Sequence, residues 1–167
     1  MTVSVLFVCL GNICRSPTAH GVFQQLLDRH NLQHAIAVDS AGTGDWHIGR
    51  APDQRSTATA LQRGYDLSVL RARQVSAEDF SRFDYILAMY AQNLKDLQRM
   101  RPPHFRGELD LFLGYGNSDL REVPDPYYGE NDGFEHVLDL VEDAAQGLLQ
   151  TIAQQHQLPL RHSEHVP

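Results

Sequence analysis

Apolar residues near the start of the chain change their spacing at a glycine-containing turn. Residues 2–8 are mostly Val, Leu and Phe, a short apolar run typical of a strand buried on both faces of a sheet. After Ser16 the apolar residues recur at helical spacing, and Pro17 is tolerated in the first turn of a helix. The positions on this stripe are Ala19, Val22, Phe23, Leu26 and Leu27. The pattern predicts a strand, a loop and a helix in that order.

The rest of the chain repeats this alternation of short apolar runs and helical stripes. Further strands are predicted at 35–39, 83–89 and 108–113, and further helices at 54–63, 90–100 and 134–152. Residues 114–132 are rich in Gly, Pro, Asp and Tyr, which predicts a long functional loop. Strands that alternate with helices indicate an α/β fold with a doubly wound, mainly parallel, four-stranded sheet flanked by helices.

The length and the net charge of the chain indicate the number of domains and the kinds of partner to expect. A chain of 167 residues fits one domain, which we expect over residues 1–157, with 158–167 as a flexible C-terminal tail. The 14 Lys and Arg residues against 21 Asp and Glu residues give a net charge of -7 without a large basic run, so we expect neither a nucleic-acid nor a membrane partner.

The two cysteines and the absence of a long apolar segment bear on the compartment. No apolar stretch reaches the roughly 18 residues of a membrane span. Two cysteines cannot form a disulfide framework or, without clustered His partners, a zinc site. We therefore expect a cytoplasmic protein that uses neither a metal nor another cofactor.

The loop between the first predicted strand and helix carries the candidate chemistry. Open parallel sheets bind ligands beyond the carboxyl ends of their strands, where this loop lies. The N–H groups and dipole at a helix N-terminus favour a thiolate, which makes Cys9 a candidate nucleophile. The loop amides and the guanidinium of Arg15 would surround one anion, and phosphate fits that arrangement. The expected phosphate-binding residues are Leu10, Gly11, Asn12, Ile13, Cys14 and Ser16.

The segment VCLGNICRSPTAHG resembles the phosphate-binding loop of the low-molecular-weight protein tyrosine phosphatases. Further segments resemble the same family in order and spacing. They are DSAGT at 39–43, the W-x-x-G-R-x-P-D run at 46–53, ARQ at 72–74, FDYILAM at 83–89 and DPYYG at 125–129. The resemblance covers nearly the whole chain through the last predicted helix.

The resemblance implies a two-step hydrolysis of phosphotyrosine without a metal. The Cys9 thiolate would attack phosphorus and form a cysteinyl-phosphate, while Arg15 and the loop amides hold the phosphoryl oxygens. Asp125 matches the family's general acid, which protonates the phenolic leaving group and then activates water as a base. Aromatic side chains could form the walls of a deep cleft that favours phosphotyrosine over phosphoserine. The expected wall residues are Trp46, Tyr127 and Tyr128.

Two further roles also come from the resemblance. Cys14 would form a reversible disulfide with Cys9 and so protect it from irreversible oxidation. Ser40 would support Asn12 of the loop by hydrogen bonding. The expected partner is a phosphotyrosine-bearing protein, with a tyrosine kinase as one candidate, and phosphate or other oxyanions are expected inhibitors.

The sequence departs from the family pattern at two positions near the loop. Leu70 stands where many relatives carry a histidine that helps to hold the loop asparagine. Tyr90 stands where relatives usually have an aspartate that could orient Arg15 or the acid loop. These changes touch none of the three expected catalytic residues, so we expect an active enzyme.

Three alternatives share the predicted fold. A thiol-dependent arsenate reductase needs further cysteines, and none follows Cys14. A protein arginine phosphatase typically has a threonine where this chain has the bulky apolar Ile13. A phosphotyrosine-binding module with weak or no turnover would explain Leu70 and Tyr90 but has no need for a general acid at Asp125.

Overall fold

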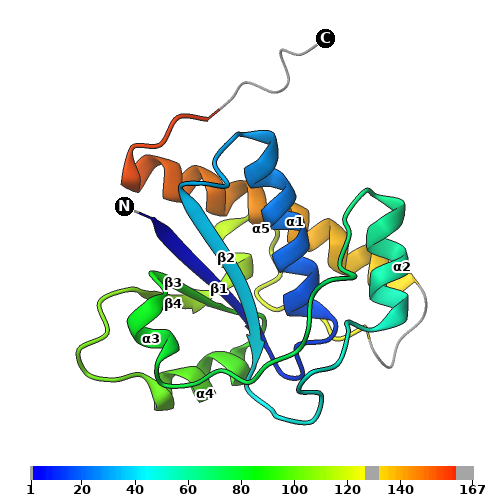
Figure 1. The fold of residues 1–167 in the computed structure, drawn as a ribbon, viewed down its shortest axis with the longest axis horizontal. Helices are drawn as coiled ribbons and strands as arrows, with labels where there is room; N and C mark the ends of the chain where they lie inside the picture. The colour runs from blue at the N-terminus through cyan, green and yellow to red at the C-terminus, as the bar shows by residue number, and fades with distance from the viewer. Residues whose placement is uncertain (1, 127–131, 161–167) are drawn as a thin grey trace.

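The computed structural model describes residues 2–126 and 132–160 (Figure 1). Four parallel strands form one sheet in the order β2-β1-β3-β4. They are β1 (Val3–Cys9), β2 (Ile36–Gly42), β3 (Tyr85–Ala88) and β4 (Glu108–Leu111). The chain leaves β1 toward β2 on one side and later returns to β3 on the other. This reversal opens a crevice at the carboxyl end of β1, where open parallel sheets bind ligands.

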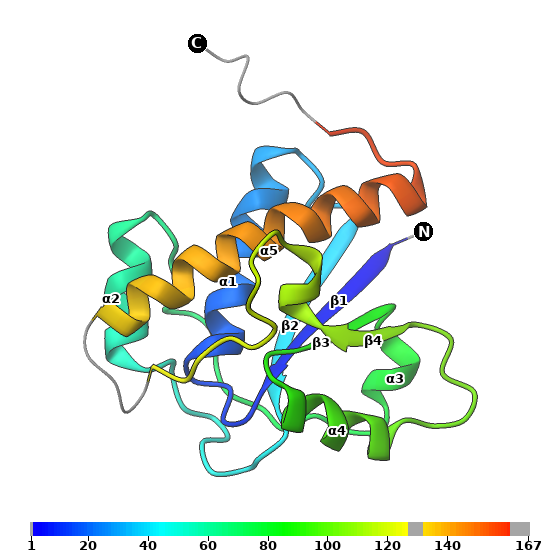
Figure 2. The same ribbon diagram turned by 180° about the vertical axis from the view of Figure 1, so that it is seen from behind.

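Helices cover both faces of the sheet, as Figures 1 and 2 show. On one face lie α1 (Arg15–Arg29) and the long α5 (Asp132–His156), with α2 (Gln54–Gln62) beside them. On the other face lie the short α3 (Asp79–Arg82) and α4 (Ala91–Met100). The predicted α/β fold with a doubly wound, four-stranded parallel sheet is therefore confirmed.

The side chains of β1 belong alternately to two separate hydrophobic cores, one on each face of the sheet. Val5 and Phe7 point to the core under α1 and α5, whereas Leu6 and Val8 point to the core under α3 and α4. This alternation follows from the two-residue period of a strand and explains why the run shows no polar face.

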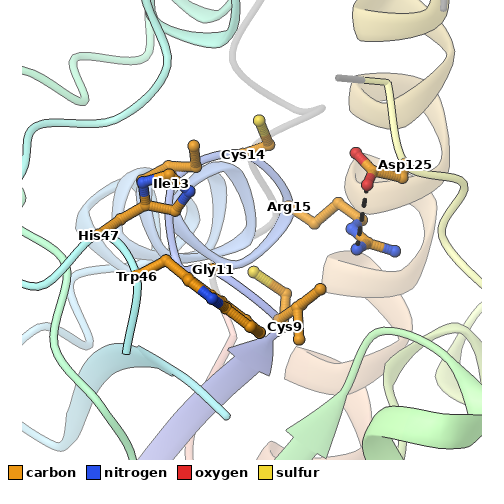
Figure 3. Close-up of a pocket in the computed structure, with 9 residues that line it drawn as sticks. Cys9, Gly11, Ile13, Cys14, Arg15, Trp46, His47 and Asp125 are labelled. Carbon is orange, nitrogen blue, oxygen red and sulfur yellow. Dashed lines mark ion pairs between the residues drawn. The ribbon is translucent and has the colours of Figure 1, made fainter. Parts of the chain in front are cut away.

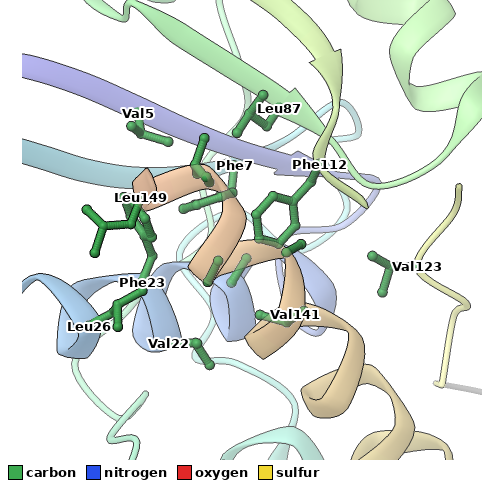
Figure 4. Packing of buried hydrophobic residues seen from close by; sticks show 14 of the residues in the cluster. Val5, Phe7, Val22, Phe23, Leu26, Leu87, Phe112, Val123, Val141 and Leu149 are labelled. Carbon is green, nitrogen blue, oxygen red and sulfur yellow. The ribbon is translucent and has the colours of Figure 1, made fainter. Parts of the chain in front are cut away.

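Three aromatic rings pack together in the larger core, the one under α1 and α5 (Figure 4). The ring of Phe7 makes edge contacts with Phe23 of α1 and with Phe112, at centroid distances of 5.7 and 4.9 Å. Phe112 begins a 3-10 helix, η1 (Phe112–Tyr115), and both Phe112 and its neighbour Leu113 are buried. Because consecutive residues both pack inward here, the chain cannot continue as a strand, and the predicted strand 108–113 ends at Leu111.

The chain after α5 stays on the protein surface for a few residues. Leu158 and Leu160 are half-buried against the larger core. The backbone N–H of Leu158 donates to the carbonyl of Ala153 at the end of α5. The start of the expected tail therefore packs on the domain. Across residues 2–126 and 132–160, the helices are all too short or too polar to span a membrane.

Candidate active site

The loop between β1 and α1 lies against the end of β2. The backbone N–H groups of Thr43 and Gly44 donate to the carbonyls of Cys9 and Leu10 at 2.9 and 2.8 Å. A Cβ atom added at Gly42 would lie 2.6 Å from the Leu10 carbonyl oxygen. Glycine is therefore needed at the end of β2 for the loop to approach this closely.

The sulfur of Cys9 receives polar contacts from its own loop. Cys9 ends β1 and is buried, with Sγ 3.0 Å from Oγ of Ser16. The backbone N–H of Asn12 donates to the same sulfur at 3.2 Å. Both contacts lie at the start of α1, which begins at Arg15 with its N-terminus toward the loop.

The side chain of Asn12 holds the loop in its shape. Its backbone has a φ of 58°, a left-handed conformation that asparagine tolerates better than most residues. Its Nδ2 donates to Ser16 Oγ at 2.7 Å, and its Oδ1 accepts from the backbone N–H of Arg73 at 3.0 Å. Both ends of the buried amide are thus hydrogen-bonded, which fixes this strained residue.

The expected bond between Ser40 and Asn12 is replaced by other contacts. Ser40 Oγ lies 3.1 Å from Nδ1 of His20 on α1. The Asn12 amide instead uses Ser16 and Arg73, because these groups lie directly beside the loop. Asn12 is therefore held by the side chain of Ser16 and by the backbone N–H of Arg73. A sequence motif does not reveal the second contact, because it is made by the backbone.

Arg73 is held by two carboxylates. Its guanidinium contacts both oxygens of the buried Asp79 at 3.1 and 3.0 Å, and its Nε lies 3.1 Å from Asp39. Asp79 also accepts from the backbone N–H of Ser76 at 2.8 Å. The segment that reaches Asn12 is thereby fixed to α3 and β2. The ARQ motif at 72–74 marks this segment in the sequence but does not predict the contact that its backbone makes.

Arg15 links the loop to the chain that precedes α5. It is buried, its Nη1 donates to the carbonyl of Val123 at 3.1 Å, and its Nη2 lies 3.7 Å from Oδ2 of Asp125. Its guanidinium carbon lies 4.6 Å from the centre of the Tyr90 ring. The expected phosphate-binding cation and the expected acid thus face each other, although they are far apart in sequence.

These side chains border one pocket of about 440 Å³ (Figure 3). Its lining residues are Cys9, Leu10, Gly11, Ile13, Cys14, Arg15, Trp46, His47 and Asp125. Trp46 and His47 approach from the loop after β2, and Asp125 approaches from the opposite side. Tyr127 and Tyr128, the other expected aromatic walls, lie outside the described residues.

His47 was not predicted as part of the site. A Cβ atom at Gly11 would come within 2.9 Å of its ring, so His47 packs directly over the loop. Its position beside Trp46, an expected wall residue, was the available signal in the sequence. Trp46 itself remains about two-thirds exposed, at 65%. An exposed aromatic at the mouth of a pocket is available to contact a ligand.

The surroundings of Cys14 keep its thiol protonated. Both cysteines are buried and free. Burial raises the pKa of the Cys14 thiol to about 12, although a hydrogen bond with Ser56 acts in the opposite direction. Cys14 is therefore a neutral thiol at physiological pH. Among residues 2–126 and 132–160, we find no cluster of three or more His, Cys, Asp or Glu side chains able to hold a metal ion.

Comparisons with known proteins agree with this geometry. The model of the family "Low molecular weight phosphotyrosine protein phosphatase" matches residues 4–158. The low molecular weight protein-tyrosine-phosphatase YfkJ of Bacillus subtilis is 43% identical over 157 residues, covering 93% of this chain and 99% of the relative.

Two solved structures illustrate the similarity of the fold. A protein tyrosine phosphatase from Entamoeba histolytica has a TM-score of 0.89 at 36% identity, covering 93% of this chain and 99% of the other. A Drosophila arginine phosphatase has a TM-score of 0.83 at 34% identity, covering 89% of this chain and 96% of the other. With its family model matched over almost the whole domain, the chain belongs to the low molecular weight phosphotyrosine protein phosphatases, a family of hydrolases.

Proposed function

We propose that Cys9 is the nucleophile and Asp125 the general acid and base of a two-step phosphotyrosine hydrolysis. In the first step the Cys9 sulfur forms a bond to phosphorus as the bond from phosphorus to the phenolic oxygen breaks, and Asp125 gives that oxygen a proton. In the second step water attacks phosphorus, Asp125 takes its proton, and the Cys9 thiolate leaves. The products are tyrosine and inorganic phosphate.

The observation that carries the proposal is the meeting of three groups at one pocket. The Cys9 sulfur lies 3.0 Å from Ser16 Oγ and accepts from the N–H of Asn12 at 3.2 Å, and Arg15 and Asp125 face each other 3.7 Å apart on the same pocket. Arg15 supplies a planar set of N–H donors that suits phosphoryl oxygens. A side-chain exposure of 40% leaves Asp125 accessible to a leaving group.

The lining of the pocket supports an aromatic phosphate ester as substrate. Ile13 and the exposed Trp46 offer apolar surface on the side opposite Asp125. A phosphotyrosine ring can pack on such surface, whereas the shorter phosphoserine side chain cannot reach across it. We propose a phosphotyrosine-bearing protein as the substrate, with a tyrosine kinase as one candidate, and phosphate and related oxyanions as competitive inhibitors.

An arginine phosphatase activity is the second candidate, because a structural relative bears that name. The apolar Ile13 in the pocket favours an aromatic ring over a charged guanidinium. Hydrolysis rates of matched phosphotyrosine and phosphoarginine peptides therefore decide between the two substrates.

The mechanism also suggests where the enzyme works. Cys9 must be reduced to attack phosphorus, so we place the protein in a reducing compartment, the cytoplasm. We further propose that peroxide converts Cys9 to a sulfenic acid and that the Cys14 thiolate then displaces its oxygen as water, forming a disulfide that thiols can reduce.

Matched phosphotyrosine, phosphoserine and phosphoarginine peptides test the proposal in the presence of a chelator. We expect selective phosphotyrosine hydrolysis that disappears in Cys9→Ser. Asp125→Asn should reduce kcat by about 10²- to 10⁴-fold, the usual contribution of a general acid. The control Asp119→Asn changes an exposed aspartate of the same loop outside the pocket and should retain full activity.

Three results would contradict the proposal. Hydrolysis retained in Cys9→Ser would exclude the covalent mechanism. Preference for phosphoarginine would exclude phosphotyrosine as the main substrate, and phosphotyrosine binding without turnover would identify a recognition module.

A further inference from the structure

Tyr90 lies at the point where β3 ends and α4 begins. Its backbone is extended, and its side chain makes no hydrogen bond that caps the helix. The local backbone is held by other residues, since Asn93 Oδ1 accepts from the N–H of Met89 at 3.0 Å and Glu122 Oε2 accepts from the N–H of Ala91 at 2.8 Å. The Tyr90 side chain is thus not needed to start α4.

The ring of Tyr90 contacts the guanidinium of Arg15. The centroid distance of 4.6 Å lies within the range of a cation–π interaction. Burial raises the pKa of Tyr90, so the hydroxyl stays neutral at physiological pH. A neutral ring therefore lies against a cation that is itself buried.

Contact through the ring face differs from an ion pair in a way that matters for anion binding. A carboxylate binds the N–H donors of the guanidinium, whereas an aromatic ring attracts the cation through its electron-rich face and carries no net charge. A carboxylate at position 90 would take N–H donors and place a negative charge beside the incoming phosphate. The Tyr90 ring does neither.

We propose that Tyr90 is a positioning residue for phosphate binding, whose ring holds the guanidinium of Arg15 in place without adding a negative charge beside the phosphoryl oxygens. The inference rests on the proposed role of Arg15 as the phosphate-binding cation. The Val123 carbonyl accepts from Nη1 at 3.1 Å, Asp125 Oδ2 lies 3.7 Å from Nη2, and the ring centre lies 4.6 Å from the guanidinium carbon. Loss of the ring would remove one of the contacts that hold this guanidinium.

Two substitutions separate the ring from the hydroxyl. Tyr90→Phe keeps the ring, and Tyr90→Leu keeps an apolar side chain without a ring. Phe105→Leu is the matched control, because Phe105 contacts Arg101 at 5.4 Å far from the pocket. The measurements are the inhibition constant of inorganic phosphate, and kcat and KM for a phosphotyrosine peptide. The inhibition constant does not depend on the fraction of folded enzyme, so a purely structural role would not change it.

We expect Tyr90→Phe and Phe105→Leu to bind phosphate like the wild type. Tyr90→Leu should raise the inhibition constant by about 3- to 30-fold, which corresponds to a partly desolvated cation–π contact. The inference is overturned if Tyr90→Leu leaves that constant unchanged, or if Tyr90→Phe weakens phosphate binding as much as Tyr90→Leu.

Arg15→Lys, measured alongside, separates this inference from the proposed function. If Arg15→Lys also leaves phosphate binding and turnover unchanged, the role of Arg15 itself is wrong. If Arg15→Lys impairs both while Tyr90→Leu impairs neither, only the role of Tyr90 is wrong.

Discussion

Asn12 shows how a single residue shapes the loop around the Cys9 sulfur. Its positive φ turns the backbone so that its N–H reaches the sulfur at 3.2 Å. The same residue bonds Ser16, whose hydroxyl lies 3.0 Å from that sulfur. The loop geometry and the environment of the proposed nucleophile are thus fixed by the same contacts.

The lowered pKa of His20 leads us to expect that the free energy of unfolding depends on pH. Burial lowers its pKa from the ordinary value of 6.5, and Asp39 only partly offsets this effect. The unfolded chain therefore binds a proton more readily than the folded protein. The free energy of unfolding should rise with pH through the interval below 6.5 and fall as the solution is acidified.

Urea unfolding of the wild type and His20→Gln at about pH 7.5 and about pH 5.5 measures this contribution. His20→Gln should lose less stability on acidification than the wild type. His104→Gln, a change at an exposed histidine, is the control. Equal losses in the wild type and His20→Gln would show that His20 does not stay neutral in the fold.

The raised pKa of Cys14 leads us to expect that the rate of disulfide formation after peroxide treatment depends on pH. Its raised pKa, about 12, keeps the thiolate scarce at neutral pH. Since the thiolate is the attacking species, formation of the disulfide with Cys9 should accelerate by up to about tenfold per pH unit between about pH 7 and 9. Mass spectrometry of the linked peptides measures the rate.

Cys14→Ser is the companion variant for this experiment. Its activity should be lost to peroxide and should not return with excess thiol once Cys9 is overoxidised. Full recovery of Cys14→Ser, or a disulfide rate that is independent of pH, would contradict the assigned role of Cys14.

At the scale of elements, the segment between α2 and α3 supports the site from outside it. Arg73 reaches Asn12 through its backbone and Asp79 of α3 through its side chain. Asp79 is almost fully buried, at 1% exposure, whereas most surface ion pairs are open to water. The orientation of this segment therefore depends on a buried carboxylate.

Asp79→Ala should reduce the free energy of unfolding by about 2 to 4 kcal/mol, because it removes the buried carboxylate that accepts from Arg73 and from the N–H of Ser76. It should also reduce kcat, since Arg73 holds Asn12. Asp96→Ala removes an exposed pair with Arg99 and should cost less than about 1 kcal/mol. Chemical denaturation measures both variants. Equal stabilities would show that the buried pair does not hold the segment.

The regular elements could largely be predicted because their apolar periods are local. The strand pattern at residues 2–8 and the helical stripe after Ser16 correspond to β1 and α1. The four-residue α3 was missed because one turn of helix is too short to show a period. The strand predicted at 108–113 was too long, since Phe112 and Leu113 pack against the core under α5, a tertiary contact that sequence periodicity does not contain.

At the scale of the whole molecule, the parallel sheet brings distant segments to one edge. Cys9 and Arg15 could be placed together from sequence because only five residues separate them. Their closeness to Asp125 and Tyr90 depends on the strand order β2-β1-β3-β4, which puts the ends of β1 and β3 side by side. The roles of His47 and the Arg73 backbone depend on loop packing and lay beyond the predicted pattern.

Detection of the covalent intermediate on Cys9 tests the central claim most directly. Asp125→Asn is mixed with a phosphotyrosine peptide, quenched in acid within one turnover and digested for mass spectrometry. We predict a phosphoryl group on the peptide that carries Cys9, and none on that peptide in Cys9→Ser. Turnover in the wild type with no phosphorylated Cys9 at any quench time, or a phosphoryl group on another residue, would contradict the account.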